Sequence, residues 1–97
     1  MNLVFHPAAR DEFLAAIEYY DDAVPGLGDR FLQAVRRATD LALTHPDAGM
    51  QRGAVRRLLV AGFPYDLVYR VRGEVVDVLA LAHQHRRPGY WRTRTRG

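Results

Sequence analysis

The sequence predicts an α+β fold in which a two-helix antiparallel hairpin packs on a small, mainly antiparallel β-sheet, in the order β-α-α-β-β-β. Two observations support this fold class. In the first half of the 97 residues, apolar side chains recur every three or four positions, as on one face of a helix. In the second half they alternate or run continuously, as in β-strands. A chain of this length forms one compact domain with one modest core.

The first half of the chain is expected to form a short strand and two helices. The strand covers residues 3–6, and Pro7 suits the first turn of a helix, because its missing N–H needs no partner there. The first helix runs over residues 7–22. The second begins near Leu27 and ends before His45, since a residue that precedes proline avoids helical backbone angles. The connection is short, so the two helices form an antiparallel hairpin.

The second half is expected to form a loop followed by three strands. The loop covers residues 47–53. The strands cover residues 54–60, 65–71 and 74–82. The middle strand presents alternate residues to opposite faces, whereas the last strand is almost continuously apolar, as a strand covered on both faces should be. Short turns predict an antiparallel meander, and the helical hairpin must cover one face of it because neither layer can bury its apolar side alone.

Charge is distributed unevenly along the chain. All 14 cationic side chains are arginine, and the formal net charge is +3. Up to Gly49 the chain carries four arginines and eight acidic residues, whereas from Met50 onward it carries ten arginines and three acidic residues. A basic half beside an acidic half indicates a polyanionic or acidic partner on one side of the molecule.

The composition excludes several classes of protein. Without cysteine the chain forms no disulfide and no thiolate metal site, and no apolar run approaches the roughly 20 residues that span a bilayer. The N-terminus lacks the basic and apolar regions of a secretion signal. His83 and His85 would face the same side of a strand and could bind a metal, but no third ligand stands out. We therefore expect a cytoplasmic protein with no metal and no cofactor.

A series of short motifs runs through nearly the whole chain in a fixed order. They are His6-Pro7-Ala8-Ala9, Tyr19-Tyr20, Pro25-Gly26-Leu27-Gly28, Phe31-Leu32, His45-Pro46 with Gly49, Val55-Arg56-Arg57-Leu58, Phe63-Pro64-Tyr65, Val68-Tyr69-Arg70-Val71, Val78-Leu79-Ala80-Leu81-Ala82-His83, Arg86-Arg87-Pro88 and Tyr90-Trp91. Each motif alone is weak, but together with the order of elements they resemble the RelE/ParE family of type II toxins, and its ParE branch in particular.

The resemblance implies a toxin that arrests growth. RelE-like members cut mRNA on the ribosome, whereas ParE-like members inhibit DNA gyrase. Both are held inactive by an antitoxin, which for this branch would be a ParD-like protein. The ParE branch is not thought to perform chemistry, so the resemblance favours a protein inhibitor of gyrase over an enzyme.

One position separates the two branches. RelE-like toxins resemble one another in a basic residue just before the Leu-Val-Tyr strand motif and a Tyr or His at the end of the chain. Here Asp66 precedes Leu67-Val68-Tyr69, and a carboxylate there would repel a phosphate. The ribosome-dependent mRNA endonuclease remains the alternative, as does a basic interaction domain that pairs only with its antitoxin. If the protein is a nuclease, its candidate catalytic residues are Arg56, Arg70, His83, His85 and Tyr90.

Basic and aromatic residues of the second half are candidates for contact with the target or the antitoxin. Arg56 and Arg57 alternate across their strand, so only one of them can share a face with Arg70. They form either a basic patch or solvated edge-strand charges. The aromatic residues of the last segment either join the contact surface or fold back on the core. The candidate binding residues are Arg56, Arg57, Arg70, His83, Arg86, Arg87, Tyr90 and Trp91.

The toxin-like domain is expected over residues 1–92. Residues 93–97 are expected to form a disordered tail, and Arg92, Arg94 and Arg96 are also expected to be disordered. For the antitoxin we expect an amphipathic segment in a hetero-oligomeric complex. Its apolar side would pack on the helical hairpin and sheet, and its acidic residues would meet the arginines of the second half.

Overall fold

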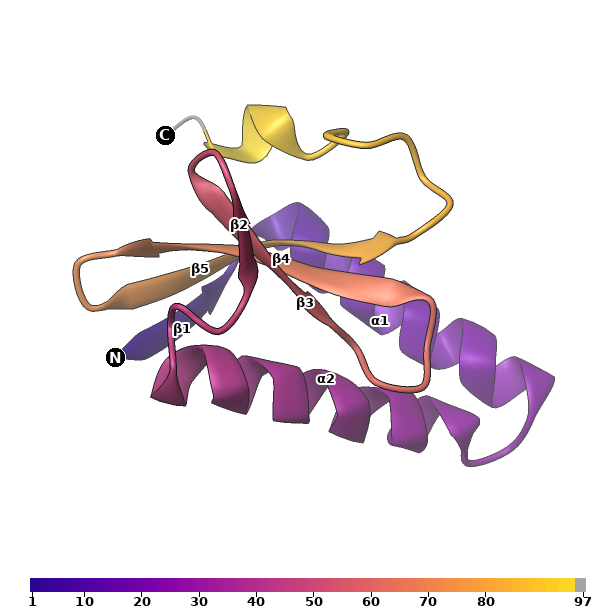
Figure 1. The fold of residues 1–97 in the computed structure, drawn as a ribbon. Helices are drawn as coiled ribbons and strands as arrows, with labels where there is room; N and C mark the ends of the chain where they lie inside the picture. Colours follow the sequence, from indigo (N-terminus) through magenta and orange to yellow (C-terminus); the bar gives the residue numbers. More distant parts are fainter. Residues whose placement is uncertain (96–97) are drawn as a thin grey trace.

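The computed structural model describes residues 1–95, which form two helices and a five-stranded sheet (Figure 1). The elements in chain order are β1 (Asn2–Phe5), α1 (Pro7–Ala23), α2 (Leu27–Thr44), β2 (Met50–Arg52), β3 (Val55–Leu59), β4 (Tyr65–Arg72), β5 (Val75–His83) and the 3-10 helix η1 (Arg92–Thr95). Both helices lie on one face of the sheet, and the segment after β5 crosses the other face (Figure 1). The predicted α+β class is confirmed.

The helical hairpin depends on one close approach between its helices. A Cβ atom on Gly28, in the first turn of α2, would lie 2.6 Å from the carbonyl oxygen of Ile17 in α1. Only glycine fits at this distance, because any side chain would push the helices apart. The backbone N–H of Gly28 donates a hydrogen bond of 2.8 Å to Asp21 Oδ1, which joins the end of α1 to the start of α2.

The sheet has the strand order β1-β5-β4-β3-β2. β1 pairs with β5 in parallel, and all other neighbours are antiparallel, so the predicted meander of three strands is confirmed. β5 lies between β1 and β4 and is buried from Val76 to Ala82, as its continuous apolar run predicts. A register shift between Val68 and Tyr69 marks a bulge in the β4–β5 pairing.

The predicted loop over residues 47–53 is wrong in one respect, because it contains the short edge strand β2. This strand pairs antiparallel with β3, and all its residues are exposed. It is too short and too polar to give a periodic signal. Tertiary bonds position it instead: the buried Tyr69 hydroxyl accepts a 3.0 Å bond from the N–H of Gly49, and Arg56 donates to the carbonyl oxygen of Gly49 at 2.9 Å.

Apolar side chains form a core on each face of the sheet. The larger core lies between the sheet and the helices, where the buried Phe31 of α2 and Tyr69 of β4 are its largest members. The smaller core lies on the opposite face, and Tyr90 packs against it from the C-terminal segment. Its buried members are Val55, Val68, Leu79, Ala80, Ala82 and Trp91.

The C-terminal segment is more ordered than the sequence predicts. We expected disorder at Arg92 and Arg94 and over residues 93–97, but residues 92–95 form η1. Arg94 is held there by hydrogen bonds to Glu12, which is 82 positions away in the sequence and therefore invisible to a local pattern. Arg96 and Gly97 lie outside the described residues.

Neither helix of the described chain is long and apolar enough to cross a membrane.

Candidate binding surface

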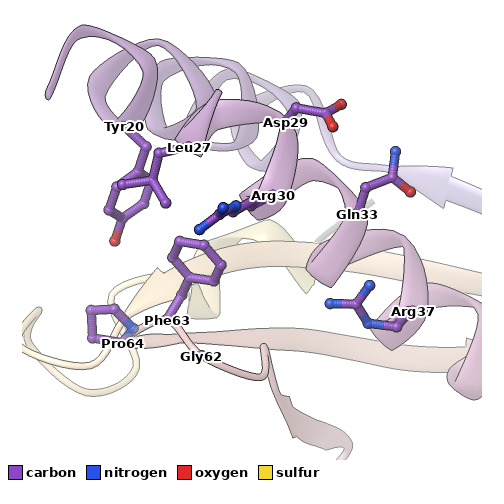
Figure 2. A pocket seen from close by; sticks show the side chains of 9 residues that line it. All are labelled: Tyr20, Leu27, Asp29, Arg30, Gln33, Arg37, Gly62, Phe63 and Pro64. Carbon is purple, nitrogen blue, oxygen red and sulfur yellow. The ribbon is translucent and has the colours of Figure 1, made fainter. Parts of the chain in front are cut away.

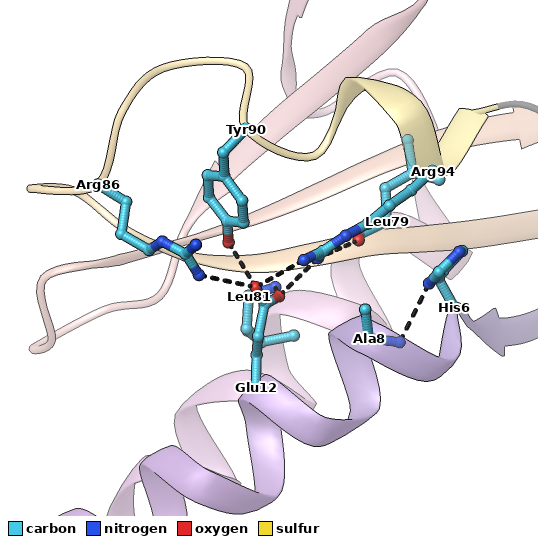
Figure 3. Close-up of polar contacts among 8 residues, drawn as sticks. All are labelled: His6, Ala8, Glu12, Leu79, Leu81, Arg86, Tyr90 and Arg94. Atoms are coloured by element: carbon cyan, nitrogen blue, oxygen red, sulfur yellow. Dashed lines mark hydrogen bonds and ion pairs between the residues drawn. The ribbon is translucent and has the colours of Figure 1, made fainter.

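A single carboxylate on α1 holds the segment that follows β5 (Figure 3). Glu12 accepts hydrogen bonds from Tyr90 Oη at 2.8 Å and from both terminal nitrogens of Arg94 at 2.9 and 3.1 Å. Arg86 Nη1 lies 3.3 Å from the same carboxylate. We call these four residues the Glu12 clasp. The side chains of Glu12 and Arg94 are each 15 % exposed, so their ion pair is largely shielded from solvent, whereas that of Arg86 is mostly exposed and contributes little.

The Glu12 clasp also closes an open edge of the sheet. β1 ends at Phe5, so among residues 1–95 no strand pairs with β5 on this side after Val78. The N–H of Leu81 donates to Glu12 Oε1 at 3.2 Å, and the carbonyl oxygen of Leu79 accepts from Arg94 Nη1 at 3.0 Å (Figure 3). Side chains thus satisfy backbone groups that would otherwise be available for pairing with another strand.

Burial and the Glu12 carboxylate change the acidity of two members of the clasp. Burial, followed by the hydrogen bond to Glu12 and the charge of that carboxylate, raises the pKa of Tyr90 to about 12. Burial alone would lower the pKa of Arg94, but hydrogen bonding to Glu12 and its charge outweigh burial and raise it. Tyr90 therefore stays protonated at neutral pH and directs its proton toward Glu12.

The predicted arginines of the sheet are bound to other parts of the chain. Arg56 donates to the carbonyl oxygens of Asp47 and Gly49 at 3.1 and 2.9 Å and so braces the segment before β2. Arg57 Nη2 forms an ion pair of 3.2 Å with Asp66. The remaining sheet candidate, Arg70, pairs with the buried Asp77 at 3.3 Å and donates to the carbonyl oxygen of Thr95 at 2.9 Å.

The five candidate nuclease residues do not gather at one place. Arg56 lies opposite Tyr69 in the strand register and so shares the helix-covered face, whereas Arg57, opposite Val68, lies on the other face. Arg70 also lies on the face opposite the helices. It therefore shares a face with Arg57 and not with Arg56. Tyr90 is bound within the Glu12 clasp.

The two histidines at the end of β5 contact each other and the sheet. The ring of His83 packs edge-on against Tyr65, with 5.1 Å between ring centroids, and against His85 at 5.2 Å. His83 Nδ1 accepts a hydrogen bond of 3.1 Å from the N–H of His85, which closes the turn after the strand. Within residues 1–95, no group of three or more potential metal-ligating side chains is placed to hold a metal ion.

Two arginines that are not among the candidate binding residues of the sequence, Arg52 and Arg92, line a groove on the sheet face opposite the helices. The groove has a volume of about 380 Å³ and lies between the β2–β3 hairpin and the segment from Pro88 to η1. Arg52, Arg57 and Arg92 line it together with the buried Val55 and Trp91. We call it the basic groove. Arg52 lies within the predicted loop and Arg92 is the last residue before the predicted tail, so no strand or helix pattern placed them on a common surface.

A further cavity lies on the helix side of the molecule (Figure 2). It has a volume of about 580 Å³ and is formed by α2 and the turn between β3 and β4. Figure 2 shows the side chain of Arg30 extending from α2 toward the ring of Phe63. Tyr20 of α1 lines the same cavity, and its ring centroid lies 5.0 Å from that of Phe63. The cavity contains none of the candidate binding residues.

An apolar surface lies where α1 meets the edge strand β1. A hollow of about 380 Å³ there is lined by Phe5, Arg10, Phe13 and Leu14. Leu14 is 52 % exposed, and Val4 of the neighbouring strand is similarly exposed. Exposed aliphatic side chains grouped in this way are typical of a protein-contact surface.

The fold and surfaces define a small, basic α+β protein in which four of the five candidate catalytic side chains are hydrogen-bonded within the structure. Its sequence matches the family described as the ParE toxin of the type II toxin–antitoxin system parDE over residues 3–88, and the chain belongs to this family. No curated protein matches the sequence. Among solved structures, the chain is similar to one from the chromosomal ParDE toxin–antitoxin system of P. aeruginosa, with a TM-score of 0.72 and 19 % identity over 86 % of this chain and 95 % of that chain. That likeness supports the fold, and the resemblance expected from the motifs is confirmed.

Proposed function

We propose that this ParE toxin inhibits DNA gyrase and blocks replication in the cytoplasm, without covalent chemistry of its own. The observation that carries this proposal is the internal use of the residues that RNA cleavage would require. Cleavage without a metal needs a base for the 2′-OH, a cation for the charged transition state and an acid for the leaving oxygen.

Four of the five candidate residues use their side chains in hydrogen bonds within the structure: Tyr90, Arg56, Arg70 and, through Nδ1, His83. The hydroxyl of Tyr90 donates to Glu12 and has a pKa raised to about 12, which makes it a poor proton donor for a leaving group at neutral pH. Arg56 and Arg70 hold backbone oxygens. Asp66, which also accepts a 3.3 Å bond from Gln84 Nε2, adds a carboxylate where a phosphate would have to approach.

A ParD-like antitoxin neutralises the toxin by covering the surface at α1 and β1. The apolar hollow at Leu14 adjoins a second one of about 180 Å³, since Phe5 lines both. Arg72 and Asp77 line the second hollow and pair with each other, and the side chain of Arg72 is 56 % exposed. An amphipathic segment laid across the two hollows would place apolar side chains at Leu14 and an acidic side chain at Arg72. The antitoxin segment expected from the sequence fits this arrangement.

A supercoiling assay with purified gyrase tests the proposed target. We expect toxin freed from its antitoxin to stop supercoiling and the antitoxin to restore it. A parallel reaction in a translating extract should give intact mRNA. Codon-linked mRNA cuts with normal supercoiling would contradict the proposal, and normal results in both reactions together with harmless expression would favour a domain that only pairs with its antitoxin.

A further inference from the structure

We propose that the basic groove binds the phosphodiester backbone of double-stranded DNA. The inference rests on the proposed function in one respect, because the DNA that the groove binds in the cell would be DNA held by gyrase. The binding itself is a property of the toxin and is measured without gyrase. It assigns a role to Arg52 and Arg92, which are not among the residues that tie the structure together.

Three guanidinium groups converge on the groove from three elements. Arg52 comes from β2, Arg57 from β3 and Arg92 from η1, and no acidic side chain lines the groove within the described chain. The nearest carboxylate in the bonding network, Asp66, contacts Arg57 through Nη2. Arg57 Nε is buried and has no hydrogen-bond partner among residues 1–95. Asp66 offsets the charge of Arg57 and lines a neighbouring pocket with Arg52 and Arg57, but it does not line the groove itself. The groove therefore keeps a net positive charge, carried by Arg52 and Arg92.

The two outer arginines are available to a ligand. In the described chain neither Arg52 nor Arg92 forms an ion pair or a side-chain hydrogen bond, in contrast to Arg56, Arg70 and Arg94. The position of Arg92 depends on Gly89, because a Cβ atom there would lie 2.6 Å from Arg92 Nε. Arg92 is thus held beside the groove, and the side-chain donors of Arg52 and Arg92 have no partner within residues 1–95.

The chemistry of the groove favours a nucleic-acid backbone over a base or an acidic peptide. The planar donors of arginine match two phosphate oxygens at a time. Trp91 is only 8 % exposed, so its ring is not available to stack on a base. An amphipathic peptide would need exposed apolar side chains to dock on, but Val55 and Trp91, the largest apolar residues of the groove, are buried. Recognition through phosphates alone is independent of sequence.

Fluorescence anisotropy with a labelled DNA duplex tests the proposal on toxin freed from its antitoxin. We expect the wild type to bind, and the double variant Arg52→Gln and Arg92→Gln to bind about tenfold more weakly at moderate salt. Each phosphate contact contributes about −0.9 to the slope of log affinity against log salt concentration. The double variant should therefore have a slope shallower by about 2.

The matched control is the double variant Arg36→Gln and Arg37→Gln. Both side chains are exposed on α2, on the opposite side of the sheet, and the change in net charge is the same. We expect this variant to keep the wild-type salt slope. Thermal unfolding followed by circular dichroism verifies that both variants fold, which the exposure of all four side chains favours.

Several results would overturn the proposal. These are absence of DNA binding by the wild type, an equal loss in the control variant, tighter binding of a single-stranded RNA of the same length, or poly-glutamate binding that depends on Arg52 and Arg92 as strongly. Failure here is distinguishable from failure of the proposed function. Toxin that binds DNA through the groove but leaves supercoiling intact refutes only the gyrase target. Toxin that inhibits gyrase without binding DNA refutes only the groove.

Discussion

The carboxylate of Glu12 and the guanidinium of Arg94 form a two-bond ion pair, at 2.9 and 3.1 Å, that joins the first helix to η1 across 82 positions of sequence. The pair fixes the C-terminal segment over the smaller core and, together with the 3.2 Å bond from Leu81 N–H, closes the free edge of β5. Part of the positive charge of the second half therefore holds the fold, and the rest is left for partners.

Glu12→Gln should lower the free energy of unfolding by about 3 kcal/mol, because removing one partner of a shielded ion pair leaves the other charge without compensation. The amide of glutamine offers a single acceptor oxygen to Tyr90, Arg94 and Leu81. Urea unfolding measures the effect. The control is Glu18→Gln, an exposed residue of the same helix, which should change the free energy by less than about 0.5 kcal/mol. Equal, small effects of the two substitutions would contradict a stabilising role for the Glu12 clasp.

Tyr90 should make the stability of the fold depend on alkaline pH. Its pKa is raised from 10 to about 12 in the folded chain, so the folded state favours the protonated hydroxyl. The contribution of the protonated Tyr90 hydroxyl to the free energy of unfolding is complete below pH 10 and is lost as pH rises through about 12. Tyr90→Phe has no hydroxyl to ionise, so its free energy of unfolding should fall less steeply across this interval.

Comparing wild type with Tyr90→Phe cancels the contribution that other ionising groups make to the pH dependence of stability. Burial also raises the pKa values of Tyr20 and Tyr65, and both residues are present in each protein. The difference between the two stability curves therefore reports on Tyr90. Parallel curves from pH 9 to pH 12 would mean that the hydroxyl does not ionise with a raised pKa.

Tyr69→Phe should destabilise the fold by about 2 kcal/mol, because it leaves a buried donor without a partner. The hydroxyl accepts from Gly49 N–H at 3.0 Å and donates to the carbonyl oxygen of Pro46 at 2.9 Å. Urea unfolding gives the free energy, and hydrogen exchange should show faster exchange at the amide of Gly49. Tyr19→Phe, at an exposed side chain, should leave both readings unchanged. Unchanged exchange at Gly49 in Tyr69→Phe would contradict the bond.

Leu14→Glu should weaken antitoxin binding by at least about tenfold, since it places a charge in the apolar hollow at α1 and would leave it desolvated in the complex. Calorimetry of toxin with its antitoxin gives the dissociation constants. Leu59→Glu is the matched control, because Leu59 is comparably exposed but lies on β3, away from this surface. An undiminished affinity of Leu14→Glu would place the antitoxin elsewhere.

The main elements follow from local sequence. Pro7 marks the start of α1, His45-Pro46 ends α2, and the continuous apolar run of β5 predicts its central position in the sheet. These signals depend on neighbours a few residues apart, which a single sequence displays directly. The strand register and the helical hairpin then follow from the need to bury one apolar face of each layer.

The features that the sequence did not reveal depend on distant partners. Glu12 and Glu18 are both acidic residues off the apolar stripe of α1, and no periodicity separates the one that binds Arg94 from the one that is exposed. The strand β2 is positioned by Tyr69, 20 positions from Gly49. Arginine content likewise does not distinguish Arg56, which braces a loop, from Arg52, whose side chain has no hydrogen-bond partner within residues 1–95.

The amount of linear plasmid DNA in a gyrase reaction is the most direct test of a toxin that acts by binding rather than by cleaving RNA. Purified toxin is added to gyrase and supercoiled plasmid, the reaction is stopped with detergent, and broken DNA is quantified. We expect linear DNA to accumulate with toxin concentration and to be absent when the antitoxin is added first. Unbroken plasmid, uninhibited supercoiling of relaxed plasmid in a parallel reaction, and codon-linked mRNA cleavage by the same toxin preparation would together contradict it.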